Sequence, residues 1–159
     1  MKIFISITII LFTTFIGKQI VSYHKRRYKY ILELNKFNNI NLVNLLGKKD
    51  KLIDVINLFN QSTTHEFKTT LDELKNCLQN HINFYVSNKD FNIEEREVFT
   101  QYFNSLGKND VLAEKQTLSN FAEIFKNIEY DLKEKYIKYS NMCVKLFFLF
   151  GCLIVILII

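Results

Sequence analysis

The amino-acid sequence predicts an all-α protein in which two transmembrane helices flank an antiparallel helical bundle. Three observations lead to this class. An apolar run lies at each end of the chain, at residues 3–16 and 146–159, and nearly every charge lies between the two runs. Residues 23–141 have no proline and only two glycines, Gly47 and Gly107. The apolar residues of this part recur three and four positions apart, as they do on one face of an α-helix. We expect transmembrane helix 1 with its interface at residues 1–22, the bundle at 23–141, and transmembrane helix 2 at 142–159.

The C-terminal run has the length and composition of a membrane span. Residues 142–159 contain one charge, Lys145, near the start of the run, where a long side chain reaches the interface. At about 1.5 Å per residue, such a helix just crosses a hydrocarbon core of about 30 Å. The N-terminal run is shorter and resembles a signal peptide, but no small-x-small cleavage site follows it, since residues 15–19 offer Gly17 alone. We therefore expect an uncleaved anchor.

Basic residues flank both runs on their inner sides. Four basic residues follow the first run, namely Lys25, Arg26, Arg27 and Lys29. Four others come before the second run, namely Lys133, Lys135, Lys138 and Lys145. Cytoplasmic flanks of membrane spans are enriched in such residues. We expect a two-pass protein of the cell membrane, with the middle in the cytoplasm and both termini outside. Much of the net charge of +5 lies in these flanks, so we expect the lipid bilayer and no nucleic acid as a partner.

The elements of the middle part are read in chain order. The first span continues as a helix from Tyr23 to about Leu46, and Gly47 is a plausible stop. A short amphipathic helix follows, with Leu52, Val55, Ile56 and Phe59 on one face.

Two helices with N-terminal capping signals come next. Residues 63–66, Thr-Thr-His-Glu, form a predicted capping box for a third helix. Its apolar face consists of Phe67, Leu71, Leu74 and Leu78. Residues 92–95, Asn-Ile-Glu-Glu, repeat the pattern for a fourth helix, which Gly107 closes.

A long helix is predicted to run from Asp110 into the second span. Its apolar seam steps by three and four residues through Leu118, Phe121, Phe125, Ile128 and Leu132. We interpret the seam as part of the bundle core, with a coiled coil as the alternative.

The sequence contains no constellation that predicts catalysis, so we expect no enzyme and no cofactor. Cys77 and His81 are four residues apart and could form half of a metal site on one helix face, but no second pair supplies further ligands. We therefore predict no metal. The three cysteines show no framework spacing and are expected to be reduced thiols.

Several short motifs resemble the stage III sporulation protein AB family of endospore-forming bacteria. Residues 106–110 are similar to its Leu-Gly-x-x-Asp turn, and Lys138 and Met142 match its Lys-x-x-x-Met before the second span. Gly151 matches a mid-span glycine, and residues 13–17 match a Thr-Thr-x-x-Gly in the first span. The sequence departs from the family at Phe147, where glycine is usual, and at Glu114, where glutamine is usual. The resemblance is thin between residues 57 and 97.

The resemblance implies a non-enzymatic platform subunit of the sporulation channel between mother cell and forespore, in the outer forespore membrane. Its helical domain would be similar to the F domain of the type II secretion platform protein. The implied partners are the sporulation ATPase AA, in the cytoplasm, and other sporulation channel membrane proteins. We expect ATPase contacts at the loops around Gly47 and Gly107, with Lys108, Asn109 and Asp110 as the candidate contact turn. The alternative for Asp110 is that it caps the last helix.

Two other functional classes remain open. A tail-anchored tethering or fusion protein would use the long last helix as a coiled coil. A small membrane enzyme would use the Cys77 and His81 face.

Overall fold

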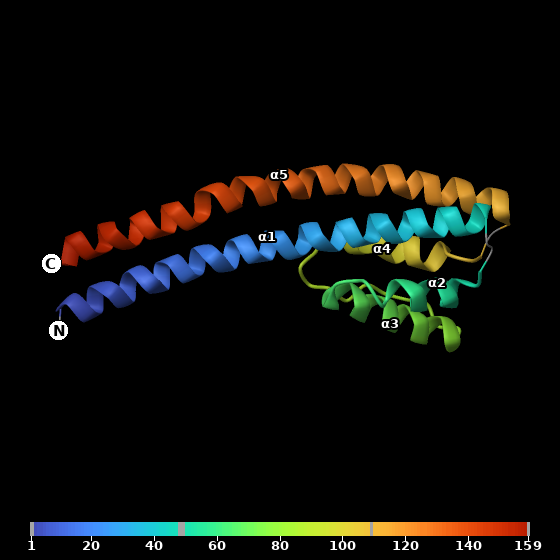
Figure 1. Ribbon diagram of the computed structural model, residues 1–159, viewed down its shortest axis with the longest axis horizontal. Coiled ribbons are helices and arrows are strands. Elements are labelled where there is room, and N and C mark those ends of the chain that lie inside the picture. Colours follow the sequence, from blue (N-terminus) through green and yellow to red (C-terminus); the bar gives the residue numbers. More distant parts are fainter. Residues whose placement is uncertain (1, 48–49, 109, 159) are drawn as a thin grey trace. The chain divides into compact units, whose positions relative to one another are not determined.

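All regular elements in the described part of the chain are α-helices, which confirms the all-α class (Figure 1). The computed structural model describes residues 2–47, 50–108 and 110–158. The elements are α1 (Lys2–Leu46), α2 (Leu52–Phe59), α3 (His65–Gln79), α4 (Ile93–Ser105) and α5 (Val111–Ile158).

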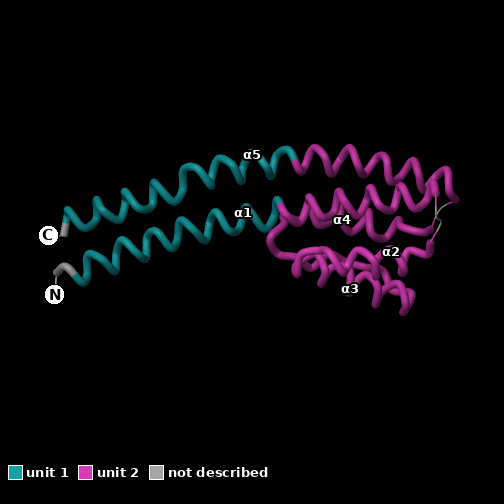
Figure 2. The backbone as a smooth tube through the Cα atoms, in the orientation of Figure 1, with its two compact units in different colours: residues 1–28, 130–159 teal, residues 29–129 magenta. Residues whose placement is uncertain are grey.

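The chain divides into two compact units, coloured separately in Figure 2. Unit 1 consists of residues 1–28 and 130–159, and unit 2 of residues 29–129. Helices α1 and α5 each contribute one part to each unit. These units follow contacts within the chain and do not locate a membrane surface. The boundaries predicted for the two spans therefore stay predictions.

Unit 2 is a helical bundle built around aromatic side chains. Phe37 of α1 is fully buried, and its ring lies 5.4 Å from that of Phe59 in α2 and 6.1 Å from that of Phe67 in α3. On the other side of the bundle, Phe99 of α4 lies 6.0 Å from Phe125 of α5. Aromatic pairs of this kind add about 0.5–1.5 kcal/mol each beyond the area they bury. Residues from all five helices thus share one core.

Most predicted helix ends are confirmed. Helix α1 ends at Leu46, and the Gly47 N–H donates to the Val43 carbonyl at 3.0 Å. At the start of α4, the Asn92 side chain accepts from the Glu95 N–H at 2.7 Å. The Glu95 side chain in turn accepts from the Asn92 N–H at 3.0 Å. This reciprocal pair is the predicted capping box.

The capping box predicted at residues 63–66 is wrong. Helix α3 begins one residue later than that box requires, with Thr64 at the N-cap and no side-chain cap hydrogen bond. The Thr63 hydroxyl instead donates to Glu33 Oε2 of α1 at 3.1 Å. The Thr63 side chain thus makes a tertiary contact with α1 in place of the local cap, in which its oxygen would have accepted from a backbone N–H of α3.

An extended segment between α3 and α4 is held by two polar side chains of α4 that the sequence did not single out. The Asn104 amide donates to the Phe84 carbonyl at 2.7 Å and accepts from the Phe84 N–H at 2.9 Å. One turn earlier, the Thr100 hydroxyl accepts from the Val86 N–H at 3.1 Å. These side chains act as a substitute strand, so that the Phe84 and Val86 side chains are buried without a sheet.

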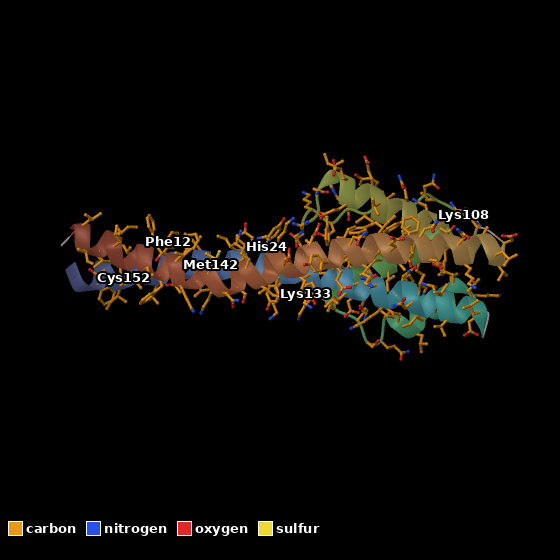
Figure 3. The ribbon with its side chains drawn as sticks, turned by 90° about the horizontal axis from the view of Figure 1, so that it is seen from above. Phe12, His24, Lys108, Lys133, Met142 and Cys152 are labelled. Atoms are coloured by element: carbon orange, nitrogen blue, oxygen red, sulfur yellow. The ribbon has the colours of Figure 1, made fainter. Side chains whose placement is uncertain are left out.

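Unit 1 is an antiparallel pair of helices, formed by the first part of α1 and the last part of α5 (Figures 2 and 3). Two glycines let the helices approach closely. A Cβ added to Gly17 would lie 3.1 Å from Phe147 Cβ and 3.3 Å from the Cys143 carbonyl. A Cβ added to Gly151 would overlap Thr13 Oγ1. Small residues serve close packing of helices within membranes in this way.

Both long helices are apolar enough to cross a membrane, judged by length and composition alone. In the most apolar window of α1 11% of residues are buried within the protein, and in that of α5 6%. The core helix of a soluble protein is mostly buried, whereas these windows expose their apolar side chains, as a lipid-facing helix does.

Candidate functional site

The turn between α4 and α5 is tied internally by Gly107 and Glu114. Gly107 has a φ of +70°, a conformation that glycine adopts without strain. Its N–H donates to Glu114 Oε1 at 2.7 Å. Glu114 is only 8% exposed, so its carboxylate serves the turn rather than the surface.

The predicted contact turn of Lys108, Asn109 and Asp110 contains one residue with a clear local role. Asp110 Oδ1 accepts from the Ala113 N–H at 2.8 Å and caps the first turn of α5. Lys108 is exposed, and Asn109 lies outside the described residues. This capping role is the alternative that we gave for Asp110 in place of a partner contact. A partner contact by this turn stays a prediction.

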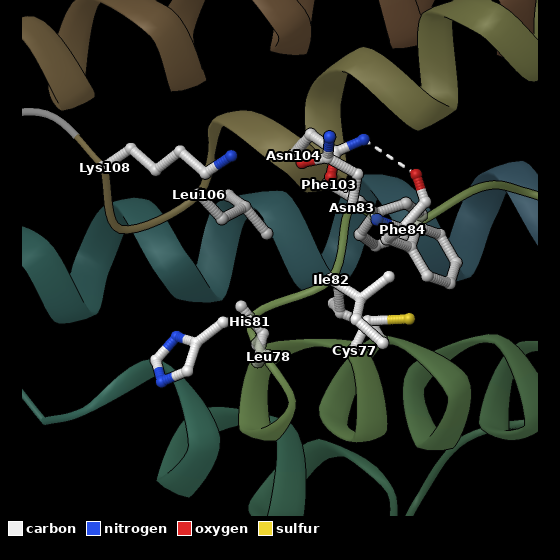
Figure 4. Close-up of a pocket in the computed structure, with 11 residues that line it drawn as sticks. Cys77, Leu78, His81, Ile82, Asn83, Phe84, Phe103, Asn104, Leu106 and Lys108 are labelled. Carbon is white, nitrogen blue, oxygen red and sulfur yellow. Dashed lines mark hydrogen bonds between the residues drawn. The ribbon is translucent and has the colours of Figure 1, made fainter.

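Lys108 also borders a small cavity of about 190 Å³ near the end of α3 (Figure 4). The lining includes Cys77 and His81, the pair considered as half of a metal site. The two residues do not share a helix face, because α3 ends at Gln79 and His81 has a φ of +56°. The imidazole and the Cys77 sulfur point in opposite directions in Figure 4. Among the described residues, no three His, Cys, Asp or Glu side chains are grouped to hold a metal ion.

A larger surface groove lies between the end of α1 and α2, next to Gly47. Its volume is about 530 Å³. The apolar lining includes Val43, which is 71% exposed, and Leu58, which is 65% exposed. The lining residues are Asn39, Ile40, Val43, Asn44, Gly47, Asp50, Asp54, Val55 and Leu58, and we call them the α1–α2 groove. The two charged residues among them, Asp50 and Asp54, are both exposed and acidic.

The sequence predicted a contact at the position of this groove, but it did not predict that the groove is lined by apolar residues. The loop at Gly47 is one of the two loops predicted to contact a partner. The apolar lining was missed, although Ile40 and Val43 stand three residues apart on α1. Neither belongs to the buried seam of Tyr30, Leu34 and Phe37. When a helix carries a second apolar stripe beside the stripe that it buries, the second stripe indicates an exposed apolar surface.

Two buried tyrosines belong to the core rather than to a reactive site. Burial raises the pKa of the Tyr30 and Tyr102 phenols well above the ordinary value. The Tyr30 hydroxyl donates to Thr70 Oγ1 at 3.2 Å. Both phenols therefore stay neutral at physiological pH and contribute packing.

The comparison of the whole chain with protein families decides its assignment. The sequence model of the stage III sporulation protein AB family matches residues 2–159. The chain belongs to this family. The stage III sporulation protein AB family has a role in stage III of spore formation, and it is not a known family of enzymes. No curated protein and no solved structure matches the chain. The likeness of the bundle to the type II secretion F domain therefore stays a prediction.

Residues that carried the resemblance to the stage III sporulation protein AB family meet in unit 1. Thr13 and Gly17 of α1 lie at the contact with α5, where Gly151 faces Thr13. Phe147, which departs from the usual glycine, packs against Gly17.

Proposed function

We propose that this member of the stage III sporulation protein AB family is a non-enzymatic platform subunit of the channel between mother cell and forespore. Its helical unit docks a cytoplasmic secretion-type ATPase, the sporulation ATPase AA. The other membrane proteins of the channel contact the two spans. The observation that carries the docking role is the exposed α1–α2 groove, an apolar surface on unit 2.

The proposed orientation rests on charge. Basic residues occupy the inner flanks of both apolar segments. Unit 2 thus faces the cytoplasm of the mother cell, with both termini outside. The ATPase is soluble in the same compartment.

The chemistry of the α1–α2 groove defines the segment that fills it. Exposed Val43 and Leu58 offer apolar area, and monomeric proteins rarely leave such area uncovered in one contiguous patch. Asp50 and Asp54 add negative charge at the rim. An amphipathic helix of the ATPase, with an apolar face bordered by lysine or arginine, is complementary to this surface.

A tethering protein that zips through α5 is less well supported. A coiled coil with a partner requires its apolar seam to be free. Leu118 and Phe125, which belong to that seam, are fully buried inside unit 2. The seam is already used by the bundle.

Binding of the full-length protein to the ATPase, measured in lipid nanodiscs, tests the docking role. Leu58→Asp places a third carboxylate in the groove and is expected to weaken binding at least about tenfold, as expected for a central interface position. Ile93→Asp is the matched control, because Ile93 is also 65% exposed and lies on α4, outside the groove.

Both substitutions are on the surface and should change stability by less than about 0.5 kcal/mol. Equal binding by Leu58→Asp and Ile93→Asp would contradict docking in the groove. Failure of the folded wild-type protein to bind at micromolar concentration would contradict docking altogether.

A further inference from the structure

Positive charge is concentrated in unit 1. This unit has nine lysines and arginines and only two acidic residues, Asp131 and Glu134. Unit 2 has twelve basic and fourteen acidic residues. The net charge of +5 for the whole chain therefore arises from unit 1 alone, and the bundle itself is slightly acidic.

Eight of the nine basic residues of unit 1 form a band where the two helices leave their apolar segments. They are Lys18, Lys25, Arg26, Arg27, Lys133, Lys135, Lys138 and Lys145. We call these eight residues the basic collar. Figure 3 labels His24 and Lys133 within this band, one from each helix.

Aromatic stacking holds the two sides of the basic collar at the same level. The His24 ring of α1 lies 4.1 Å from the Tyr139 ring of α5, at an interplanar angle of 4°. One turn further along α1, Tyr28 stacks on Tyr136 at 5.8 Å. Lysines and arginines of both helices are thereby brought to one zone, rather than distributed along two independent segments.

We propose that the basic collar is a binding site for the phosphate groups of anionic phospholipids. The site combines cations from both helices with aromatic rings that suit the membrane interface. The positive-inside rule requires only that basic residues occur in each flank. A binding site requires that the charges of both helices converge, and the stacked pairs provide that convergence.

The electrostatic environment of His24 supports this convergence. Burial lowers the pKa of His24, and the charges of Arg27 on α1 and Lys135 on α5 lower it further. Cations of both helices thus act on one imidazole, which also contacts the rings of Tyr23 and Tyr139. A bound phosphate would offset that positive potential.

The two acidic residues of unit 1 do not cancel the site. Asp131 and Glu134 lie on α5 in the same surface depression as Lys135 and Lys138. The Glu134 carboxylate accepts from the Tyr130 hydroxyl at 3.1 Å. With both acids counted against it, the basic collar keeps a clear excess of positive charge.

Lipid selectivity of the full-length protein provides the test. The protein is placed in nanodiscs of phosphatidylcholine with a minor share of phosphatidylglycerol, and the lipids retained after extraction are counted by native mass spectrometry. We expect phosphatidylglycerol to be enriched. Lys135→Gln with Lys138→Gln should reduce its binding about fivefold for each charge removed.

The control removes the same charge from the same helix, through Lys115→Gln with Lys126→Gln in unit 2. These lysines are exposed and lie outside the basic collar. Enrichment that persists in the collar variant, or that is lost equally in the control, would overturn the proposal. So would the absence of any enrichment in the wild-type protein.

The imidazole of His24 gives a second, local readout by NMR. Its pKa should rise when phosphatidylglycerol is added, while His65 and His81 of unit 2 serve as internal references. Inorganic phosphate at equal ionic strength, in pure phosphatidylcholine, should leave His24 unchanged. An equal response to inorganic phosphate would mean a site for soluble anions and would overturn the assignment to lipid.

Discussion

Asp110 and Glu114 show how local demands occupy polar residues that stand in a candidate contact turn. Asp110 caps α5 through the Ala113 N–H, and Glu114 accepts from the Gly107 N–H. Each carboxylate satisfies a backbone donor at a helix boundary. Lys108 is also charged and exposed, and it is therefore the residue of this turn best placed to contact a partner.

Substitution of Asp110 separates capping from partner contact. Asp110→Ala should lower the free energy of unfolding by about 1 kcal/mol, because one backbone donor at the start of α5 loses its acceptor. Asp110→Asn keeps a capping oxygen and should change stability little. Denaturant titration of the full-length protein measures both values.

The same pair of variants tests the contact directly. If Asp110 acts only as a cap, Asp110→Asn binds the ATPase as the wild-type protein does. Weaker binding by a fully stable Asp110→Asn would show that the charge of Asp110 reaches the partner.

Tyr30 and Tyr102 are expected to make the fold sensitive to alkaline pH. Burial raises the pKa of both phenols, whereas tyrosines in the unfolded chain lose their protons near pH 10. Because the folded pKa is the higher one, the stabilisation is fully present below about pH 10 and is lost as the pH rises further. Tyr30→Phe should flatten the decline of the unfolding free energy above about pH 10. An unchanged decline of the unfolding free energy with pH in Tyr30→Phe would contradict the role of this buried phenol.

The helices themselves were largely predictable from the sequence. Their apolar spacing, the glycines at 47 and 107 and the Asn92 cap are local signals, and all of these ends are confirmed. Contacts between distant segments were not predictable. Thr63 reaches Glu33 rather than its own helix, and Asn104 binds the Phe84 backbone twenty residues away. No local pattern distinguishes such a polar side chain from a solvated one.

The candidate site was predictable in position only. The loop at Gly47 was expected to contact a partner, and the α1–α2 groove lies beside it. Its apolar lining depends on tertiary packing, because α2 leaves Val43 of α1 and its own Leu58 uncovered. The sequence spacing of Cys77 and His81 did not reveal that α3 ends between the two residues.

The contact between α1 and α5 in unit 1 is expected to depend on Gly151. Gly151→Ala would overlap Thr13 Oγ1 and place a Cβ 3.2 Å from Ile10 Cα. Overpacking of this kind costs about 1–3 kcal/mol, which exceeds the gain of about 1 kcal/mol from the helix propensity of alanine. A net loss of stability in mixed micelles is the expected result.

A second substitution provides the control. Thr13→Ala removes the overlapping hydroxyl, so the double variant Thr13→Ala with Gly151→Ala should recover part of the loss. Additive losses in the double variant would contradict direct contact between these two residues.

At the scale of the whole molecule, the two ends of the chain and its middle part have different surfaces. Unit 1 carries apolar surface and positive charge, and unit 2 carries a closed aromatic core with an exposed acidic and apolar groove. Membership of the stage III sporulation protein AB family sets this arrangement within spore formation. In our proposal, unit 1 holds the protein in the membrane and unit 2 presents the groove to the ATPase.

Site-specific photo-cross-linking in sporulating cells tests this proposal most directly, because it requires both the orientation and the contact. A photoreactive residue at position 58 lies in the groove, and one at position 93 is equally exposed outside it. We predict an adduct with the cytoplasmic ATPase from position 58 and none from position 93. No adduct from position 58 in cells that accumulate both proteins, or equal adducts from both positions, would contradict docking through the α1–α2 groove.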